Sequence, residues 1–423
     1  MYAVLYAATT VLSLALLAAS SRRNIWTIVL LTSLLFGVVG FCIIPRDGVY
    51  IDMIRFFDTL DSARLLGGNG IVDRWQYLMA NWNYDGVPVA GIILAFCSML
   101  DNNGWINFLA GFVDVFAGLY LVAKASTRLD SKSALVFGAA FFLVVFNYMS
   151  AVSGVRTNMA SSIACCLAYR HLVEGRRGAI SYLAYIPLVL IHPFSAIVPA
   201  VDISALLSKR HRGMIVVAAL LLLSWPVWQT YLFSVFEAFS FIPFFGSLAF
   251  KSSQYFGEGA YIGSPTVFSR WRSILLFIGL AAFVLYSLRR TDSLKSRYGT
   301  YTAFFLCLCL GCVQDEEMFS RCTSVMLFVS LPYMVSLWTV LSASDARGSV
   351  HVGQFMVGVG LAAFMYVNLV DNMRAGVAYV VVDLGFESLA LLFACILVAV
   401  LADGTVGLRY ARASRQRRAH ARP

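Results

Sequence analysis

Two short stretches of this sequence place an ionisable side chain beside a long apolar run, where such groups are costly and usually functional. Gly154-Val155-Arg156 opens one apolar run, and His192-Pro193 interrupts the next. Arginine grips phosphate oxygens in a bidentate way, and histidine exchanges a proton near neutral pH. Together they indicate a site that binds an anion and moves a proton.

Each residue also has a structural interpretation, which the sequence leaves open. Arg156 could be an interfacial arginine that extends its charge to the membrane surface. His192 could hydrogen-bond a backbone carbonyl that Pro193 leaves unpaired. Three further arginines, Arg270, Arg272 and Arg321, also stand at the starts of apolar runs.

Helix N-termini attract anions even without a formal charge. Arginine at three separate helix starts therefore predicts one pocket for a di-anionic headgroup beside lipid. Asp315 and Glu316 lie in the short loop before the last of these starts. They are candidates for substrate binding and for proton transfer respectively.

Composition explains which elements must carry these residues. The 423-residue chain is 60% hydrophobic and 13% charged, with a mean hydropathy of +0.78, whereas soluble domains are about 45–50% apolar and about 25% charged. We therefore expect an all-α polytopic integral membrane protein. Long continuous runs such as 25–44 exclude a transmembrane β-barrel.

The basic residues predict the topology, because cytoplasmic loops collect Lys and Arg. With the N-terminus outside and the C-terminus inside, 22 of the 32 Lys and Arg residues face the cytoplasm. This arrangement needs about 13 transmembrane helices, within a range of about 11 to 14. It also needs a re-entrant or interfacial helix over 87–100 and a turn at His192-Pro193. The net charge of +10 is thus topological, and we expect no nucleic-acid partner.

The expected organisation is a single transmembrane domain over 1–408, with outer loops at about 45–104 and 236–270, followed by a basic cytoplasmic tail over 409–423 that contacts anionic lipid. Asp52, Arg55, Asp58, Asp61 and Arg64 recur every three residues, which predicts an amphipathic surface helix that ends at Gly67. Most aromatic residues of the two outer loops suit the bilayer interface. A few are expected to stack on sugars, and the candidates are Trp75, Trp82, Tyr255 and Tyr261.

No metal or other cofactor is expected. The nine cysteines lie inside apolar runs, and no histidine lies near the closest group, Cys307, Cys309 and Cys312. Small apolar packing residues are the simpler interpretation.

Residues 154–196 resemble the EpsG-type family of bacterial polysaccharide polymerases, a Wzy-like group. The matching features are the early loop with Asp47, Tyr50 and Asp52, then Gly154-Val155-Arg156, then His192-Pro193-Phe194-Ser195, and Arg321 before a late span. Two features depart from the family pattern. Thr157 stands where the family often has Gln, and the early Asp and Tyr, with Asp52 among them, match the pattern only loosely.

This resemblance implies a GT-C-like fold and a metal-independent reaction on the outer face of the bacterial inner membrane. An undecaprenyl-pyrophosphate-linked oligosaccharide is the donor, and the non-reducing end of a second lipid-linked unit is the acceptor. The protein must hold the charge of the leaving pyrophosphate and position both sugars. His192 is then the expected base, with Asp52, Asp315, Glu316 and Glu317 as alternatives. A chain-length regulator protein is a further partner that such systems use.

Two other functions compete with the polymerase. A flippase or other transporter of lipid-linked sugars should show pseudo-symmetric halves and charges deep in the spans. Here only Asp114 and Glu387 lie deep in predicted spans. A polyprenyl-phosphate-dependent sugar transferase should show paired acids in its first outer loop, and Asp47 with Asp52 meets that only weakly. The sugar, the linkage and the type of polymer are not predicted.

Overall fold

The described part of the protein is almost entirely helical, as the composition predicts. The computed structural model describes residues 1–46, 51–208, 213–256, 267–290, 296–342 and 352–399. Of these, 84% are helical, and there is almost no sheet. Because lipid offers no hydrogen-bond partners, helices that satisfy their own backbone groups are the expected response to a sequence this apolar.

Five described helices are long and apolar enough to cross a membrane. They are α1 (Tyr2–Ala19), α6 (Gly104–Leu129), most of α16 (Val267–Arg290), α18 (Glu316–Ser342) and α19 (Val352–Tyr379). A sixth arises if α13 (Gly213–Leu223) and α14 (Trp225–Ala238) form one span bent by 68°. Other predicted spans are shorter helices, such as α2 (Ile25–Phe41) and α7 (Lys132–Val145). The count of about 13 therefore stays a prediction.

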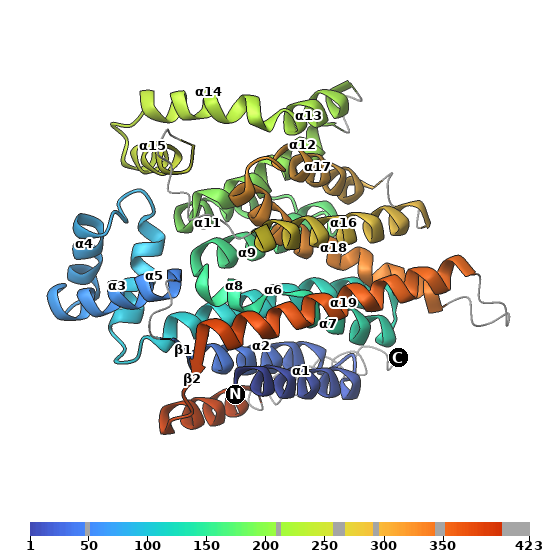
Figure 1. Ribbon diagram of the computed structural model, residues 1–423, viewed down its shortest axis with the longest axis horizontal. Coiled ribbons are helices and arrows are strands. Elements are labelled where there is room, and N and C mark those ends of the chain that lie inside the picture. The colour runs from blue at the N-terminus through green and yellow to red at the C-terminus, as the bar shows by residue number, and fades with distance from the viewer. Residues whose placement is uncertain (47–50, 209–212, 257–266, 291–295, 343–351, 400–423) are drawn as a thin grey trace, which may run out of the picture.

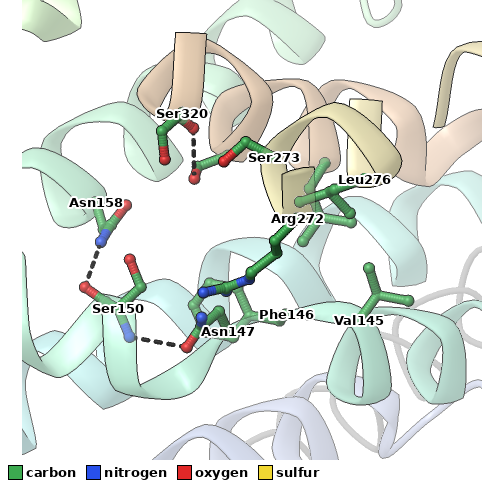
Figure 2. A pocket seen from close by; sticks show the side chains of 11 residues that line it. Val145, Phe146, Asn147, Ser150, Asn158, Arg272, Ser273, Leu276 and Ser320 are labelled. Carbon is green, nitrogen blue, oxygen red and sulfur yellow. Dashed lines mark hydrogen bonds between the residues drawn. The ribbon is translucent and has the colours of Figure 1, made fainter. Parts of the chain in front are cut away.

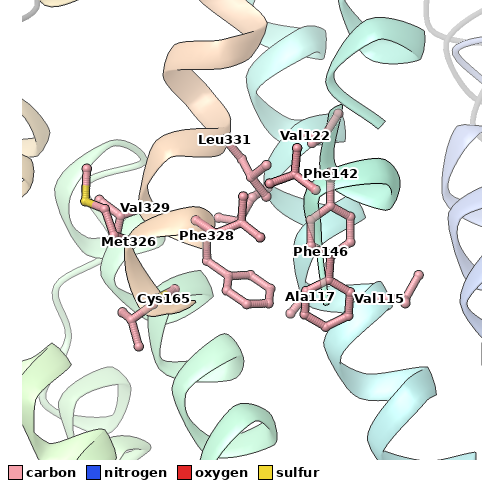
Figure 3. Packing of buried hydrophobic residues seen from close by; sticks show 14 of the residues in the cluster. Val115, Ala117, Val122, Phe142, Phe146, Cys165, Met326, Phe328, Val329 and Leu331 are labelled. Atoms are coloured by element: carbon pink, nitrogen blue, oxygen red, sulfur yellow. The ribbon is translucent and has the colours of Figure 1, made fainter. Parts of the chain in front are cut away.

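The centre of the bundle is built from α2, α6, α7, α18 and α9 (Val155–Leu172), which pack along one another. Phe142 of α7 and Phe146, which follows the end of this helix, pack against Phe328 of α18, with ring centroids 5.0–5.8 Å apart (Figure 3). Gly118 of α6 faces the Phe142 ring so closely that any side chain there would collide with it. The packing of aromatic rings against glycine thus sets how closely these helices approach.

Both segments predicted to form outer loops lie at one end of the bundle (left in Figure 1). The first holds α3 (Asp52–Leu66), α4 (Ile71–Asn81) and α5 (Pro88–Ser98), and the second holds α15 (Pro243–Phe256). The amphipathic helix predicted from Asp52 to Arg64 is α3, and Gly67 caps it as expected. The short α8 (Tyr148–Ser153) lies near the same end.

The run over 179–208 is broken where the sequence predicts a turn. It forms α10 (Ala179–Leu183), α11 (Tyr185–Ile191), the 3-10 turn η1 (Pro193–Ala196) and α12 (Ile197–Ser208). His192 adopts an extended backbone between α11 and η1, because a residue before proline avoids the helical region. Both α11 and α12 pack against α9. Helix α17 (Arg297–Gly311), which is distant in the sequence, also contacts α12.

The C-terminal apolar residues form a long helix, a short strand and a further helix. Helix α19 continues to Tyr379, and β2 (Val380–Val382) follows it before a helix over Phe386–Ala399. Strand β2 pairs antiparallel with β1 (Ile43–Pro45), with Ile43 opposite Val382. Three consecutive β-branched valines favour a strand, and the exposed edge of β1 supplies a partner that a hydropathy profile cannot show.

Candidate functional site

Arg156 lies between two aromatic rings at the start of α9. Its guanidinium carbon is 5.4 Å from the ring centroid of Phe56 on α3 and 5.1 Å from that of Tyr84, which lies between α4 and α5. The side chain is half-buried, and its Nε atom is buried with no hydrogen-bond partner in the part of the chain that the structure describes. Within the described residues, no carboxylate forms an ion pair with Arg156. The two rings therefore hold a cation in place without neutralising it.

Trp75 lies near these two rings, Phe56 and Tyr84, which together form the Arg156 cage. Its Nε1–H donates to the backbone carbonyl of Pro88 at 3.2 Å. A Cβ atom on Gly91 would lie 3.1 Å from the Trp75 ring and 3.4 Å from Tyr84. Helix α5 thus approaches Trp75 and the Cβ atom of Tyr84 closely at this glycine.

Asp52 stands at the exposed start of α3, one helical turn before Phe56. Its carboxylate pairs with Arg55 at 3.2 Å, and the guanidinium of Arg55 lies 5.9 Å from the Phe56 ring centroid. The ring of Phe56 is therefore contacted by two arginines. Arg55 is exposed, and the carboxylate of Asp52 compensates its charge. Arg156 is half-buried, and no carboxylate among the described residues compensates its charge.

The His192 turn contacts Arg321 through Phe194. The backbone N–H of Phe194 donates to His192 Nδ1 at 3.3 Å, and the histidine is 9% exposed. The guanidinium of Arg321 lies 6.0 Å from the Phe194 ring centroid and pairs with Glu317 at 2.6 Å. The Oγ atom of the next residue, Ser195, is buried, and no described residue hydrogen-bonds it. Tertiary packing thus joins two of the sequence motifs at one place.

Asp315 precedes α18 and caps it by accepting a hydrogen bond from the Met318 N–H at 3.2 Å. Its other carboxyl oxygen, Oδ2, is buried and has no hydrogen-bond partner among the residues described. Burial raises the pKa of Asp315, an effect that the hydrogen bond from Met318 partly opposes. The half-buried Glu316 follows as the first residue of α18.

Arg272 lies on α16 and pairs with Asp371 of α19, with Nε 2.6 Å from Oδ2. It also lines a cavity of about 90 Å³ between α16, α18 and the α7–α9 connection (Figure 2). In that wall Asn147 accepts from the Ser150 N–H at 3.0 Å, and Asn158 donates to the Ser150 carbonyl at 2.9 Å. The lining offers amides, hydroxyls and one guanidinium, which suits hydroxyl groups of a ligand; it consists of Val145, Phe146, Asn147, Ser150, Asn158, Arg272, Ser273, Leu276, Ser320, Ser324 and Leu327.

A comparison with known protein families identifies the chain. The profile of the EpsG family matches residues 92–396. The chain belongs to the EpsG family. No curated protein and no solved structure matches it. Membership indicates a membrane protein with a role as a polysaccharide polymerase, a glycosyltransferase-type activity.

The EpsG match covers most of the predicted site residues but begins after α3 and α4. Asp52, Trp75 and both rings of the Arg156 cage therefore lie outside the matched region. Tyr255 falls within the bounds of α15, but its side chain lies outside the described residues, as do Asp47, Tyr50 and Tyr261.

The structure gives the four predicted arginines different surroundings. Arg156 lies between the rings of the cage, Arg272 lines the cavity, and Arg321 lies on Phe194. The side chain of Arg270 is exposed. Ser320 also lines the cavity, and Arg321 follows it in the sequence. Arg321 therefore lies close to the cavity that Arg272 lines. Arg272 and Arg321 carry carboxylate partners, whereas Arg156 is half-buried and has none among the described residues.

Sequence reasoning missed the cage rings and the amides of the cavity. Phe56 and Tyr84 are ordinary aromatic residues in a segment rich in them, and only contacts across 72 or more positions reveal their role. Asn147 gives a weak signal, because an Asn before a short helix is a typical N-cap.

Proposed function

We propose that this EpsG-family protein is a polysaccharide polymerase that joins undecaprenyl-pyrophosphate-linked repeat units on the outer face of the bacterial inner membrane. A hydroxyl of the acceptor attacks the anomeric carbon of the donor sugar, the bond from that carbon to the pyrophosphate oxygen breaks, and the lipid pyrophosphate leaves. The hydroxyl proton passes to a base. Family membership and the Arg156 cage are the support for this reaction.

The observation that carries the proposal is the uncompensated charge of Arg156. Arg272 and Arg321 are held by Asp371 and Glu317, at 2.6 Å each. Arg156 instead rests between two rings, with its buried Nε unpaired. A half-buried guanidinium of this kind binds an anion strongly, because part of its desolvation cost is already met in the folded protein. We assign it to the pyrophosphate of the donor.

The other predicted residues take supporting roles around this charge. Arg272 and Arg321 are paired with carboxylates, so their proposed contribution is hydrogen bonds to the substrate, and Arg272 reaches the cavity, which would take sugar hydroxyls. The exposed Arg270 adds a positive charge. Trp75 is proposed to stack on a sugar, and Tyr255 is proposed for the same role from its residue type alone. Asp315 binds a hydroxyl, and its raised pKa favours the protonated, donating form.

His192 is the proposed base. Its Nδ1 accepts a hydrogen bond from the Phe194 N–H, so the neutral ring carries its proton on Nε2. The ring takes up a second proton at Nδ1, which requires this 3.3 Å bond to open. Glu316 and Asp52 are the carboxylate alternatives, and Asp52 is already engaged with Arg55.

Reconstitution tests the proposal. The purified protein in nanodiscs receives a pyrophosphate-linked repeat unit from its native pathway, and the products are separated as a glycan ladder. We expect a ladder from the wild type and none from Arg156→Ala or His192→Ala. If the wild type gives no ladder but moves the lipid across vesicle membranes, the protein is a transporter. If it instead transfers single sugars from a polyprenyl phosphate, it is a sugar transferase of another class.

A further inference from the structure

A second polar cluster lies at the far end of α9. His171 is the next-to-last residue of this helix, and 15 residues at 1.5 Å each separate it from Arg156 by about 22 Å. The His171 ring is fully buried, as is Asp202 of α12. Ser181 of α10 completes the cluster. None of these residues takes part in the proposed polymerase reaction.

The hydrogen bonds of the cluster determine where the protons lie. His171 Nδ1 is 2.7 Å from Asp202 Oδ2, and His171 Nε2 is 2.5 Å from Ser181 Oγ. An ionised carboxylate only accepts, so the proton of the neutral ring sits on Nδ1. Nε2 is then a lone pair, and the Ser181 hydroxyl donates to it. Tyr185 donates to the same Asp202 oxygen at 2.9 Å and holds the carboxylate in place.

We propose that Ser181, His171 and Asp202 form a nucleophilic serine site that accepts an acyl group from an ester carried by an amphiphile. A carboxylate that orients an imidazole, which in turn accepts the proton of a hydroxyl, is the arrangement of a Ser-His-Asp triad and is identified by geometry rather than by fold. This inference is independent of the polymerase, because it uses different residues at the other end of the bundle.

The surroundings of Ser181 fit an amphiphilic ester. Ser181 is partly exposed, whereas its two partners are buried. The neighbouring Ile180 and Leu183 are 84% and 57% exposed, so an apolar surface adjoins the hydroxyl. An acyl chain packs against such a surface while the ester group reaches Ser181.

Arg177 supplies the positive charge that a developing oxyanion needs. Its Nε–H donates to the backbone carbonyl of His171 at 3.0 Å, which holds the guanidinium at the same end of α9. The side chain is half-buried and has no carboxylate partner within the described part of the chain. Its terminal N–H groups are the donors we assign to the oxyanion.

The reaction balances without any further reagent. Ser181 Oγ forms a bond to the ester carbonyl carbon while its proton passes to His171 Nε2. The ester C–O bond then breaks, and the proton on Nε2 passes to the departing alkoxide. Water attacks the acyl-serine by the same route, which releases the carboxylic acid and restores the hydroxyl.

Covalent labelling of the full-length protein in detergent micelles tests the site. The probe is an alkyl fluorophosphonate, and peptide mass spectrometry locates the adduct. We expect one adduct per chain on Ser181, its loss in Ser181→Ala and His171→Gln, and labelling slowed by about 10³- to 10⁴-fold in Asp202→Asn. Ser204→Ala is the matched control, since this serine of α12 donates its hydroxyl to the backbone carbonyl of Ala200, and Ser181 of this variant should label like that of the wild type.

Two outcomes would overturn the proposal. One is folded wild-type protein with no adduct on Ser181, and the other is an adduct that forms at an unchanged rate in His171→Gln. Because replacing buried His171 or Asp202 can prevent folding, Ser181→Cys provides a second measurement. Its thiol should react with iodoacetamide faster than the same variant combined with Arg177→Met. Equal rates would remove Arg177 from the site, and an unreactive thiol would refute activation by His171. The assay contains no glycan, so a failed polymerase assay leaves it unaffected.

Discussion

Replacement of Arg156 is the sharpest test of the proposed polymerase site. A bidentate guanidinium makes two charge-assisted hydrogen bonds to a pyrophosphate, each worth about 1.5–3 kcal/mol. Arg156→Ala therefore loses about 3–6 kcal/mol of transition-state binding, which corresponds to a roughly 10²- to 10⁴-fold fall in kcat/KM at about 1.4 kcal/mol per tenfold. No carboxylate is released by the change, so this loss is not offset by relief elsewhere.

The cage rings should contribute a smaller, separable amount. Tyr84 lies 5.1 Å from the guanidinium carbon of Arg156, so Tyr84→Leu removes one cation–π contact of about 1 kcal/mol. We expect a fall of about fivefold in kcat/KM from this variant. Arg156→Lys keeps the charge but loses both the stacking and the bidentate grip, and its effect should fall between the other two.

Arg55→Ala is the matched control, because Arg55 also contacts Phe56 but is exposed and paired with Asp52. It should change kcat/KM by less than about twofold. The assay measures the initial rate of ladder formation at several donor concentrations in nanodiscs. Arg156→Ala within about threefold of the wild type, or Arg55→Ala as defective as Arg156→Ala, would refute the assignment.

Three further predictions concern folding and charge. Gly40→Ala should destabilise the protein by about 1–3 kcal/mol, because its Cβ would collide with a backbone carbonyl of α6. Gly358→Ala, in open space on α19, should cost nothing, and thiol-reactive fluorescence of the buried cysteines during heating measures both. The raised pKa of Asp315 favours its protonated form in the folded protein, so its stabilising effect is present at acid pH and is lost as pH rises through that pKa. Asp315→Asn should therefore unfold at a higher temperature than the wild type near about pH 8 and lose this advantage near about pH 4, whereas a constant difference would contradict the reasoning. Asp371→Ala should cost about 1–2 kcal/mol because it strands Arg272, and a double-mutant cycle with Arg272→Met should show coupling; additive effects would mean that the 2.6 Å pair contributes little.

Local patterns in the sequence predicted much of the fold correctly. The three-residue spacing of charges predicted helix α3, and Gly67 predicted where this helix ends. His192-Pro193 predicted the break before η1, because proline constrains the backbone of the residue before it whatever the surroundings. The pairing of β1 with β2 was beyond such reasoning, since Val380–Val382 is equally apolar as a strand or as part of a span.

Some residues of the candidate site could be predicted from the sequence, and others could not. Arg156, Arg321 and His192 were selected from the sequence because charge beside an apolar run is unusual enough to be noticed in one segment. Their partners were not, because Phe56, Tyr84 and Phe194 are aromatic residues in a chain with 14% of them, and only a contact distinguishes one from another. His171 was missed as well, since its proximity to Asp202 arises only when α9 packs against α12.

The sequence alone determined that this is a helical membrane protein and which charged side chains stand at helix ends, because hydropathy and backbone constraints act within a single segment. Tertiary structure alone decided which arginines are neutralised, with Asp371 beside Arg272 and Glu317 beside Arg321, and which one remains a free cation between two rings. Whether a charge is available to a ligand depends on distances of a few ångströms between separate helices. Those distances follow from how the helices pack, which no single segment encodes.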